Sequence, residues 1–289
     1  MKIPPVYRAT FAAGFCLAGL TVSAAPIPEN CLTGGFAVGC QAWTFNHFTV
    51  LEAIDKTAEA GGKVIEFYPG QKFSPEQSGL KFDHNATDEM IAVVQARLNK
   101  DNIRAVNYGV VDIPKDEAGA RKVFDFAKKL GLYGITTEST GSIDTIEKLV
   151  REYDIRVGFH NHERRPSEPS YRNWDPHYIL SLVKGRDPRI GATADTGHWV
   201  QSGLKPVDCL RILKGRIISV HLHDMNEMSP GSHDVPDGTG VSDVAGILSE
   251  LKRQRFAGNV SIEYEYNWEG NVVDAAQCIG FIRGYGAKK

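Results

Sequence analysis

The sequence predicts a single (β/α)8 barrel domain over residues 25–289, and three observations support this fold class. Short β-rich runs alternate with amphipathic stretches eight times from Phe36 onward. The chain has 289 residues, the usual size of such a barrel once a short N-terminal leader is set aside. The alternative is a doubly wound open sheet, but no Gly-x-Gly-x-x-Gly follows the first run, so the usual phosphate-binding signature of that fold is missing.

Each β-rich run is expected to form one barrel strand and each amphipathic stretch one outer helix. The expected strands are Phe36–Ala42, Lys63–Phe67, Ile103–Asn107, Gly134–Glu138, Arg156–His160, Ile190–Asp195, Ile217–His221 and Val260–Glu265. The expected helices are Val50–Ala60, Asp88–Lys100, Glu117–Leu130, Thr145–Tyr153, Tyr178–Lys184, Val207–Leu213, Val244–Gln254 and Val273–Gly284. Three long loops, residues 69–87, 163–175 and 225–240, are expected at the mouth of the barrel, where they either cover the substrate or shield the rim.

The first 24 residues have the features of a secretory signal peptide. Lys2 and Arg8 precede a 14-residue apolar stretch, and small residues follow up to Ala24. We therefore expect cleavage after Ala24 and export to the periplasm or beyond. The apolar stretch is shorter than the ~20 residues that span a bilayer, so we expect no membrane attachment after cleavage, with an uncleaved anchor as the alternative.

The composition indicates a folded body that does not bind nucleic acid. The 33 Lys and Arg residues against 35 Asp and Glu residues leave a net charge of -2, which cannot neutralise a run of phosphates. Export permits disulfides, but the cysteines beyond the leader are too scattered for a disulfide framework. Cys31 and Cys40 are the only close pair, and the sequence leaves open whether they are bridged.

Polar residues gather where the expected strands end. Alternate side chains of a strand point to opposite faces, so Val220 can pack under the helices while Ser219 and His221 face the barrel interior. The same alternation places one polar residue per strand near its carboxyl end, namely Gln41, Glu66, Asn107, Glu138, His160, Asp195, His221 and Glu263. Burying unpaired polar groups costs several kcal/mol, so this arrangement indicates an active site at the C-terminal mouth of the barrel.

The residue types at this mouth favour a divalent metal. Mixed histidine and carboxylate ligands suit Mn, Co, Zn or Fe, with Mg left open. The segments that carry them are Thr136–Ser139, Phe159–Glu163, Ala194–Trp199, His221–Asp224 and Ile262–Asn267.

These segments resemble those of the xylose-isomerase-like barrel superfamily, the sugar isomerase and epimerase proteins grouped with the AP endonuclease 2 family. The resemblance implies one metal ion at the mouth, with Asp195, His221 and Glu263 as ligands. Many members carry Glu at the end of the fifth strand, where this chain has His160. Either His160 is the remaining ligand or Glu138 from the fourth strand is, and we favour Glu138.

The resemblance also implies an enzyme that removes a proton α to a sugar carbonyl. Return of the proton elsewhere gives isomerisation or epimerisation, and loss of a β oxygen from a 3-keto-glycoside gives elimination. The candidate catalytic residues are His160, His162 and Glu265. The two histidines suit the role of base because an unperturbed imidazole is largely neutral at neutral pH. The expected substrate-binding residues are Gln41, Glu66, Asn107, His198, Trp199, His223 and Asn267. Tryptophans near loop ends, Trp43 and Trp199 among them, either stack on a sugar ring or belong to the core.

Two other functions are considered. A non-catalytic sugar-binding barrel would not need His162 and Glu265, which remain unassigned after four ligands are counted. A phosphodiesterase like the AP endonucleases is disfavoured by the negative charge and by export. The expected partner is a small carbohydrate, free or in a glycoside. The identity of the sugar, the metal and the oligomeric state, a homo-oligomer included, stay open.

Overall fold

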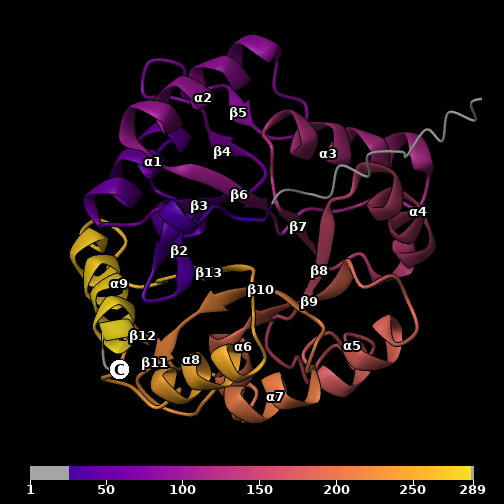
Figure 1. Ribbon diagram of the computed structural model, residues 1–289, viewed down its shortest axis with the longest axis vertical. Coiled ribbons are helices and arrows are strands. Elements are labelled where there is room, and N and C mark those ends of the chain that lie inside the picture. The colour runs from indigo at the N-terminus through magenta and orange to yellow at the C-terminus, as the bar shows by residue number, and fades with distance from the viewer. Residues whose placement is uncertain (1–25, 288–289) are drawn as a thin grey trace, which may run out of the picture.

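The computed structural model describes residues 26–287, and eight parallel strands in this range form a nearly closed barrel (Figure 1). The strands are β2 (Phe36–Gln41), β3 (Val64–Phe67), β6 (Arg104–Tyr108), β7 (Gly134–Thr137), β8 (Arg156–His160), β9 (Ile190–Asp195), β10 (Ile217–Leu222) and β13 (Asn259–Ile262). They neighbour one another in the order β6, β3, β2, β13, β10, β9, β8 and β7. At the seam between β6 and β7, the Tyr133 N–H donates to the Val106 carbonyl at 2.8 Å. The predicted barrel fold is confirmed.

Helices surround the strands as an outer ring (Figure 1). They are α1 (Val50–Glu59), α2 (Asp88–Asp101), α3 (Glu117–Lys129), α4 (Ile143–Tyr153), α5 (Pro176–Val183), α6 (Thr196–Gln201), α7 (Pro206–Ile212), α8 (Val244–Arg253) and α9 (Val272–Ala287). Short 3-10 helices cover Glu29–Cys31, Ala42–Phe45 and Thr140–Ser142. A further short strand, β1 (Leu32–Thr33), pairs antiparallel with β2.

Side-chain oxygens at the helix starts explain where several helices begin. Thr49 forms a capping box with Glu52 at the start of α1, and Thr87 caps α2. Asp116, Asp175 and Asp243 cap α3, α5 and α8 through backbone N–H groups of the first turn. These side chains satisfy N–H groups that have no partner within their helix, which fixes the end of each preceding loop.

The barrel interior is polar, in contrast to the apolar layer between strands and helices. Val220 packs in the apolar layer, whereas its neighbour Ser219 bonds Thr193 inside the barrel at 2.8 Å, as the alternation along β10 predicts. Thr193 lies 3.0 Å from Thr136, whose hydroxyl donates to Glu66 at 2.9 Å. A chain of hydrogen bonds thus crosses the barrel beneath its mouth.

Some element bounds differ from the sequence prediction. The ladder between β10 and β13 ends with the pair Leu222 and Ile262, so β13 stops before Glu263 rather than at Glu265. Helix α6 starts directly at the end of β9 and was not predicted as a helix. Two of the long loops contain short hairpins, which are β4 (Gln71–Lys72) with β5 (Lys81–Phe82), and β11 (Asp224–Met225) with β12 (Asp234–Val235).

Two further findings concern cysteines and membranes. The four cysteines within residues 26–287 are free and buried, so Cys31 and Cys40 are not bridged. None of the helices in that range is long and apolar enough to cross a bilayer. The predicted signal peptide, residues 1–24, lies outside the described residues.

Candidate metal centre and active site

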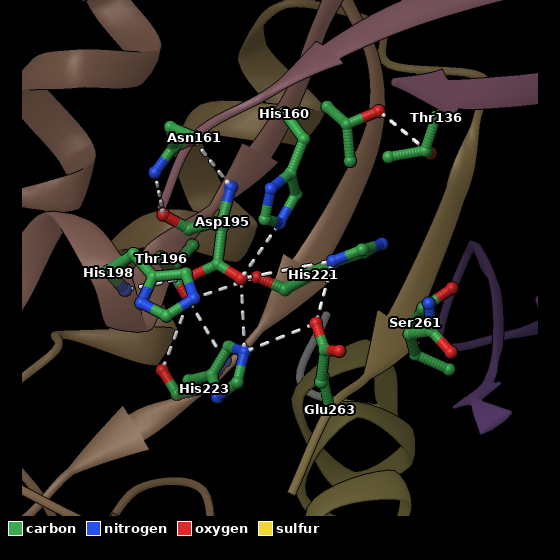
Figure 2. A network of polar contacts seen from close by, with 12 residues as sticks. Thr136, His160, Asn161, Asp195, Thr196, His198, His221, His223, Ser261 and Glu263 are labelled. Carbon is green, nitrogen blue, oxygen red and sulfur yellow. Dashed lines mark hydrogen bonds and ion pairs between the residues drawn. The ribbon is translucent and has the colours of Figure 1, made fainter. Parts of the chain in front are cut away.

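Four side chains from neighbouring strands converge at the mouth of the barrel (Figure 2). His160 ends β8, Asp195 ends β9, His221 lies on β10, and Glu263 follows β13. One nitrogen or oxygen of each lies within 4.8 Å of the others, and all four residues are buried. We call these residues the four-donor cluster.

The four-donor cluster fits a divalent metal ion because its facing atoms lack other partners. Nε2 of His160, Oδ2 of Asp195 and Nδ1 of His221 are buried and make no hydrogen bond. His160 Nε2 lies 3.4 Å from Asp195 Oδ2, and His221 Nδ1 lies 2.7 Å from Glu263 Oε2 without hydrogen-bond geometry. Buried polar atoms without partners are costly, and a set of two imidazoles and two carboxylates suits a divalent transition metal.

The chain fixes Asp195 so that one oxygen is left for the site. Its Oδ1 accepts the His198 N–H at 2.8 Å and thereby caps α6. Its backbone N–H donates to the Asn161 side chain, which in turn donates to the Asp195 carbonyl, both at 3.0 Å (Figure 2). The strand end is therefore held on two sides, and Oδ2 remains free to ligate.

His221 is held from below by Glu66. Its Nε2 lies 3.1 Å from Oε1 of Glu66 without hydrogen-bond geometry, and Oε2 of Glu66 accepts hydrogen bonds from Ser261 and Asn259. Glu66 is fully buried. Nε2 of His221 therefore faces Glu66, and Nδ1 faces the other donors of the cluster.

Glu138 lies on the outer side of His160, away from the four-donor cluster. Its Oε1 lies 2.7 Å from Nδ1 of His162, 2.8 Å from the Tyr171 hydroxyl and 3.2 Å from Nδ1 of His160. Burial acts to raise the pKa of Glu138, but hydrogen bonds from His160 and His162 outweigh it and hold that pKa well below its usual range. The sequence favoured Glu138 as the fourth ligand. In the structure His160 belongs to the four-donor cluster, whereas Glu138 forms a second group with His160 and His162 whose ligand atoms also lie within 4.8 Å of one another.

A pocket of about 290 Å³ opens onto the four-donor cluster. It is lined by Gln41, Trp43, Tyr68, Pro69, Val110, His160, His162, His198, Glu263 and Glu265. Trp43 is 39% exposed and meets Tyr68 edge to face, with ring centroids 4.9 Å apart. The pocket is thus lined both by aromatic and apolar side chains and by histidines and carboxylates, the pattern of a small-molecule site.

Four of the candidate catalytic and substrate-binding residues line this pocket beside the four-donor cluster: Gln41, His162, His198 and Glu265. Burial, and next the charge of Glu263, raise the pKa of Glu265. Gln41 is fixed, since its amide donates to the Gly109 carbonyl at 2.8 Å.

The other expected substrate-binding residues lie elsewhere. Glu66 and Asn107 are fully buried in the barrel interior, and Trp199, on the unpredicted α6, is buried in the hydrophobic core. His223 lies beside the four-donor cluster, with Nδ1 2.8 Å from Asp234. Its Nε2 makes no hydrogen bond and lies 3.3 Å from Asp195 and 3.6 Å from Glu263. Asn267 is exposed and donates to Asp274. None of these residues lines the pocket, so direct contact with a substrate there would need a rearrangement.

Sequence reasoning missed two residues that support the site. Asn161 fixes the end of β9, and Tyr171 reaches Glu138 from the loop before α5. The signal for Asn161 was its position between His160 and His162 at a strand end. Tyr171 lies in a loop without periodicity, so no local pattern marked it.

The fold and the site define a barrel with a candidate metal centre at the carboxyl ends of its strands. The family described as xylose isomerase-like TIM barrel matches residues 54–282, and the chain belongs to that family. No curated protein matches the chain.

Solved structures of the same fold cover most of the chain. An uncharacterised protein from Parabacteroides distasonis is 30% identical, with 86% of this chain and 98% of that chain covered and a TM-score of 0.68. A D-tagatose 3-epimerase-like protein is 18% identical over 86% and 96% of the two chains, with a TM-score of 0.67. A D-allulose 3-epimerase from Methylomonas sp., solved in complex with D-allulose, is 17% identical over 86% and 96%, with a TM-score of 0.65. At these sequence identities, the similarity to the last two structures shows only that they share the fold of this chain.

Proposed function

We propose that the protein is an exported, divalent-metal-dependent enzyme that removes a proton α to a sugar carbonyl. Its substrate would be a free sugar, which it isomerises or epimerises, or a 3-keto-glycoside, from which it eliminates. The observation that carries the proposal is the convergence of unpartnered buried donors beside a pocket that also holds His162 and Glu265. Two sugar 3-epimerase-type proteins with this fold support it.

The metal site would consist of His160, Asp195, His221 and Glu263. A divalent cation held there would polarise a substrate carbonyl and stabilise the negative charge that develops on its oxygen. The protein positions these donors with Glu66, Asn161 and the start of α6, so little reorganisation is needed when the substrate enters.

His162 is the proposed base. Its Nδ1 faces Glu138 at 2.7 Å, which leaves Nε2 as the proton acceptor of a side chain that lines the pocket. An imidazole with one nitrogen held by a carboxylate becomes a stronger base at the other nitrogen, because the carboxylate stabilises the imidazolium that forms. His162 would therefore take the substrate proton at Nε2.

Glu265 is the proposed second proton carrier. It lines the same pocket from the segment after β13, whereas His162 follows β8. Burial raises its pKa, which moves the carboxyl group toward the range of a general acid. A base and an acid that approach from different strands serve either epimerisation, with return of the proton to the carbon, or elimination, with protonation of the leaving oxygen.

Solvent exchange tests the proposed reaction. Protein that has been stripped with chelator and reloaded with Mn, Co or Zn is incubated in deuterated water with free sugars and with 3-keto-glycosides, and NMR follows each C–H. We expect metal-dependent exchange or elimination with one of the two substrate groups, and His162→Gln is the matched inactive control. Sugar binding without any exchange would instead support a sugar-binding barrel, and cleavage of abasic DNA would support the phosphodiesterase alternative.

Export is tested separately. Residues 1–24 carry the pattern of a cleavable signal peptide. Mass spectrometry of the protein from the native cell envelope should find an N-terminus at Ala25. Recovery of intact Met1 from the cytoplasmic fraction would contradict this proposal.

A further inference from the structure

Tyr171 connects a long loop to the active site. It lies between β8 and α5, and its hydroxyl donates to Oε1 of Glu138 at 2.8 Å. The same hydroxyl accepts the backbone N–H of His162 at 2.7 Å. The Arg165 guanidinium lies over the Tyr171 ring, 4.4 Å from its centroid. The Tyr171 hydroxyl thus joins the start of this loop, at His162, to Glu138.

Glu138 receives three donors on a single oxygen. Besides Tyr171, Oε1 faces Nδ1 of His162 at 2.7 Å and Nδ1 of His160 at 3.2 Å. An ionised carboxylate only accepts hydrogen bonds, so both contacts require imidazoles that carry a proton on Nδ1. A neutral imidazole with a proton on Nδ1 has its lone pair on Nε2. In His160 that atom faces Asp195, and it is buried without a hydrogen bond.

We propose that Glu138 and Tyr171 form a positioning pair that fixes both histidines as Nδ1–H tautomers. Glu138 selects the tautomers, and Tyr171 anchors Glu138 and ties residues 162–171 to the mouth of the barrel. The consequence for catalysis rests on the proposed function: His160 then offers Nε2 to the metal and His162 offers Nε2 to the substrate proton. The tautomers and the loop anchor do not depend on any reaction.

The two histidines share one carboxylate, so their orientations are coupled. Loss of the Glu138 carboxylate would free two imidazole rings at once. One is that of His160, in the four-donor cluster, and the other is that of His162, which lines the pocket. Loss of the phenol hydroxyl alone would leave Glu138 with its histidine contacts but free the loop. The two changes therefore predict different signatures.

The first experiment reads the tautomers directly. Protein with 15N-labelled histidine is compared with Glu138→Gln by long-range 1H–15N NMR, zinc-loaded and metal-free, at a pH where His162 is neutral. We expect His162 to show a protonated Nδ1 and an unprotonated Nε2, and Glu138→Gln to show a mixture or the opposite tautomer. An Nε2–H tautomer of His162 in the unaltered protein, or no change in Glu138→Gln, would overturn the proposal.

The second experiment isolates the loop anchor with a matched pair of tyrosines. Tyr178 lies under Arg172 at the same 4.4 Å, and its hydroxyl makes no hydrogen bond within residues 26–287. Tyr171→Phe should speed hydrogen exchange of the segment that begins at His162 by about tenfold, the effect of one lost hydrogen bond, whereas Tyr178→Phe should not. Equal exchange in the two variants would overturn the anchor role.

Kinetics then distinguish positioning from simple packing. Tyr171→Phe should lower kcat about tenfold with KM little changed, because the pocket wall stays while Glu138 keeps its histidine contacts but loses the hydroxyl that anchors it. If the NMR and exchange results hold but no tested sugar is converted, the proposed function fails and the positioning pair stands. If sugars are converted normally by Glu138→Gln, the positioning pair fails and the proposed function stands.

Discussion

Polar residues at the carboxyl ends of the strands play different roles in the two halves of the barrel. In the first half, from β2 to β7, polar residues near the strand ends are satisfied by their neighbours, as where Asn107 donates to Thr136 and accepts the Tyr108 N–H. In the second half, from β8 to β13, His160, Asp195 and His221 leave buried atoms without hydrogen bonds. A polar residue at a strand end thus marks the mouth, and the unsatisfied atoms of the second half mark the candidate metal centre.

The largest effect should follow loss of a second-half donor. We expect His221→Ala and Glu263→Gln to lose at least ~100-fold in metal affinity, since each removes a direct ligand and leaves the other buried charges unpaired. Metal analysis after dialysis and competition with a chelator measures this. Gln41→Ala, a change at the matching position of the first half, should keep its metal. If both ligand variants still copurify with a full equivalent of metal, the proposed difference between the two halves is wrong.

His162→Gln should lower turnover by a factor of ~100 to 10,000 while metal content stays the same, the usual contribution of a general base. Exchange of substrate C–H with deuterated solvent measures the rate. The exposed His177, changed to Gln, serves as the control. If His160→Gln and His162→Gln both kept near-normal exchange, neither histidine would be the base.

Glu66→Gln tests whether the first half supports the second. Glu66 Oε1 lies 3.1 Å from Nε2 of His221, so the amide should weaken metal binding by ~10- to 100-fold, the effect typical of a residue behind a ligand. Calorimetric titration with Zn measures the affinity, and circular dichroism shows whether the barrel still folds. Glu59→Gln, an exposed change on α1, should leave the affinity unchanged. Equal affinities in the two variants would mean that the halves act independently.

A smaller effect concerns stability and pH in the loop after β12. Burial, and next the charge of Asp224, raise the pKa of Asp237 to about 8. The folded protein therefore keeps a proton that the unfolded chain releases above about pH 4. The stabilisation that this proton gives is complete below pH 4 and is lost as the pH rises through 8.

Asp237→Asn should remove this dependence and raise the free energy of unfolding at pH 8 by ~1 to 2 kcal/mol. Urea unfolding at pH 5 and pH 8 measures how steeply the free energy of unfolding changes with pH in this variant and in the unaltered protein. The exposed Asp112→Asn serves as a control. A steeper slope in Asp237→Asn than in the unaltered protein would contradict the assignment.

The barrel was predictable because its strands and helices carry strong local patterns, and the residue at each strand end followed from alternation. The choice between Glu138 and His160 was not predictable in this way. It depends on β7 stopping at Thr137, so that Glu138 leaves the strand direction and turns toward Nδ1 of His160 and His162. For Trp199 the sequence left a sugar contact and a core position open, and the structure shows the core position, since β9 passes into α6 without a loop and the ring is buried.

Asp195 serves two structures with one carboxylate. Oδ1 starts helix α6 and Oδ2 faces the four-donor cluster. A substitution of Asp195 that is meant to change the metal preference would therefore also remove the N-cap of α6. A substitution that changes the preferred ion should therefore disturb the fold less at Glu263, which caps no helix, than at Asp195, where one carboxylate both faces the cluster and starts a helix.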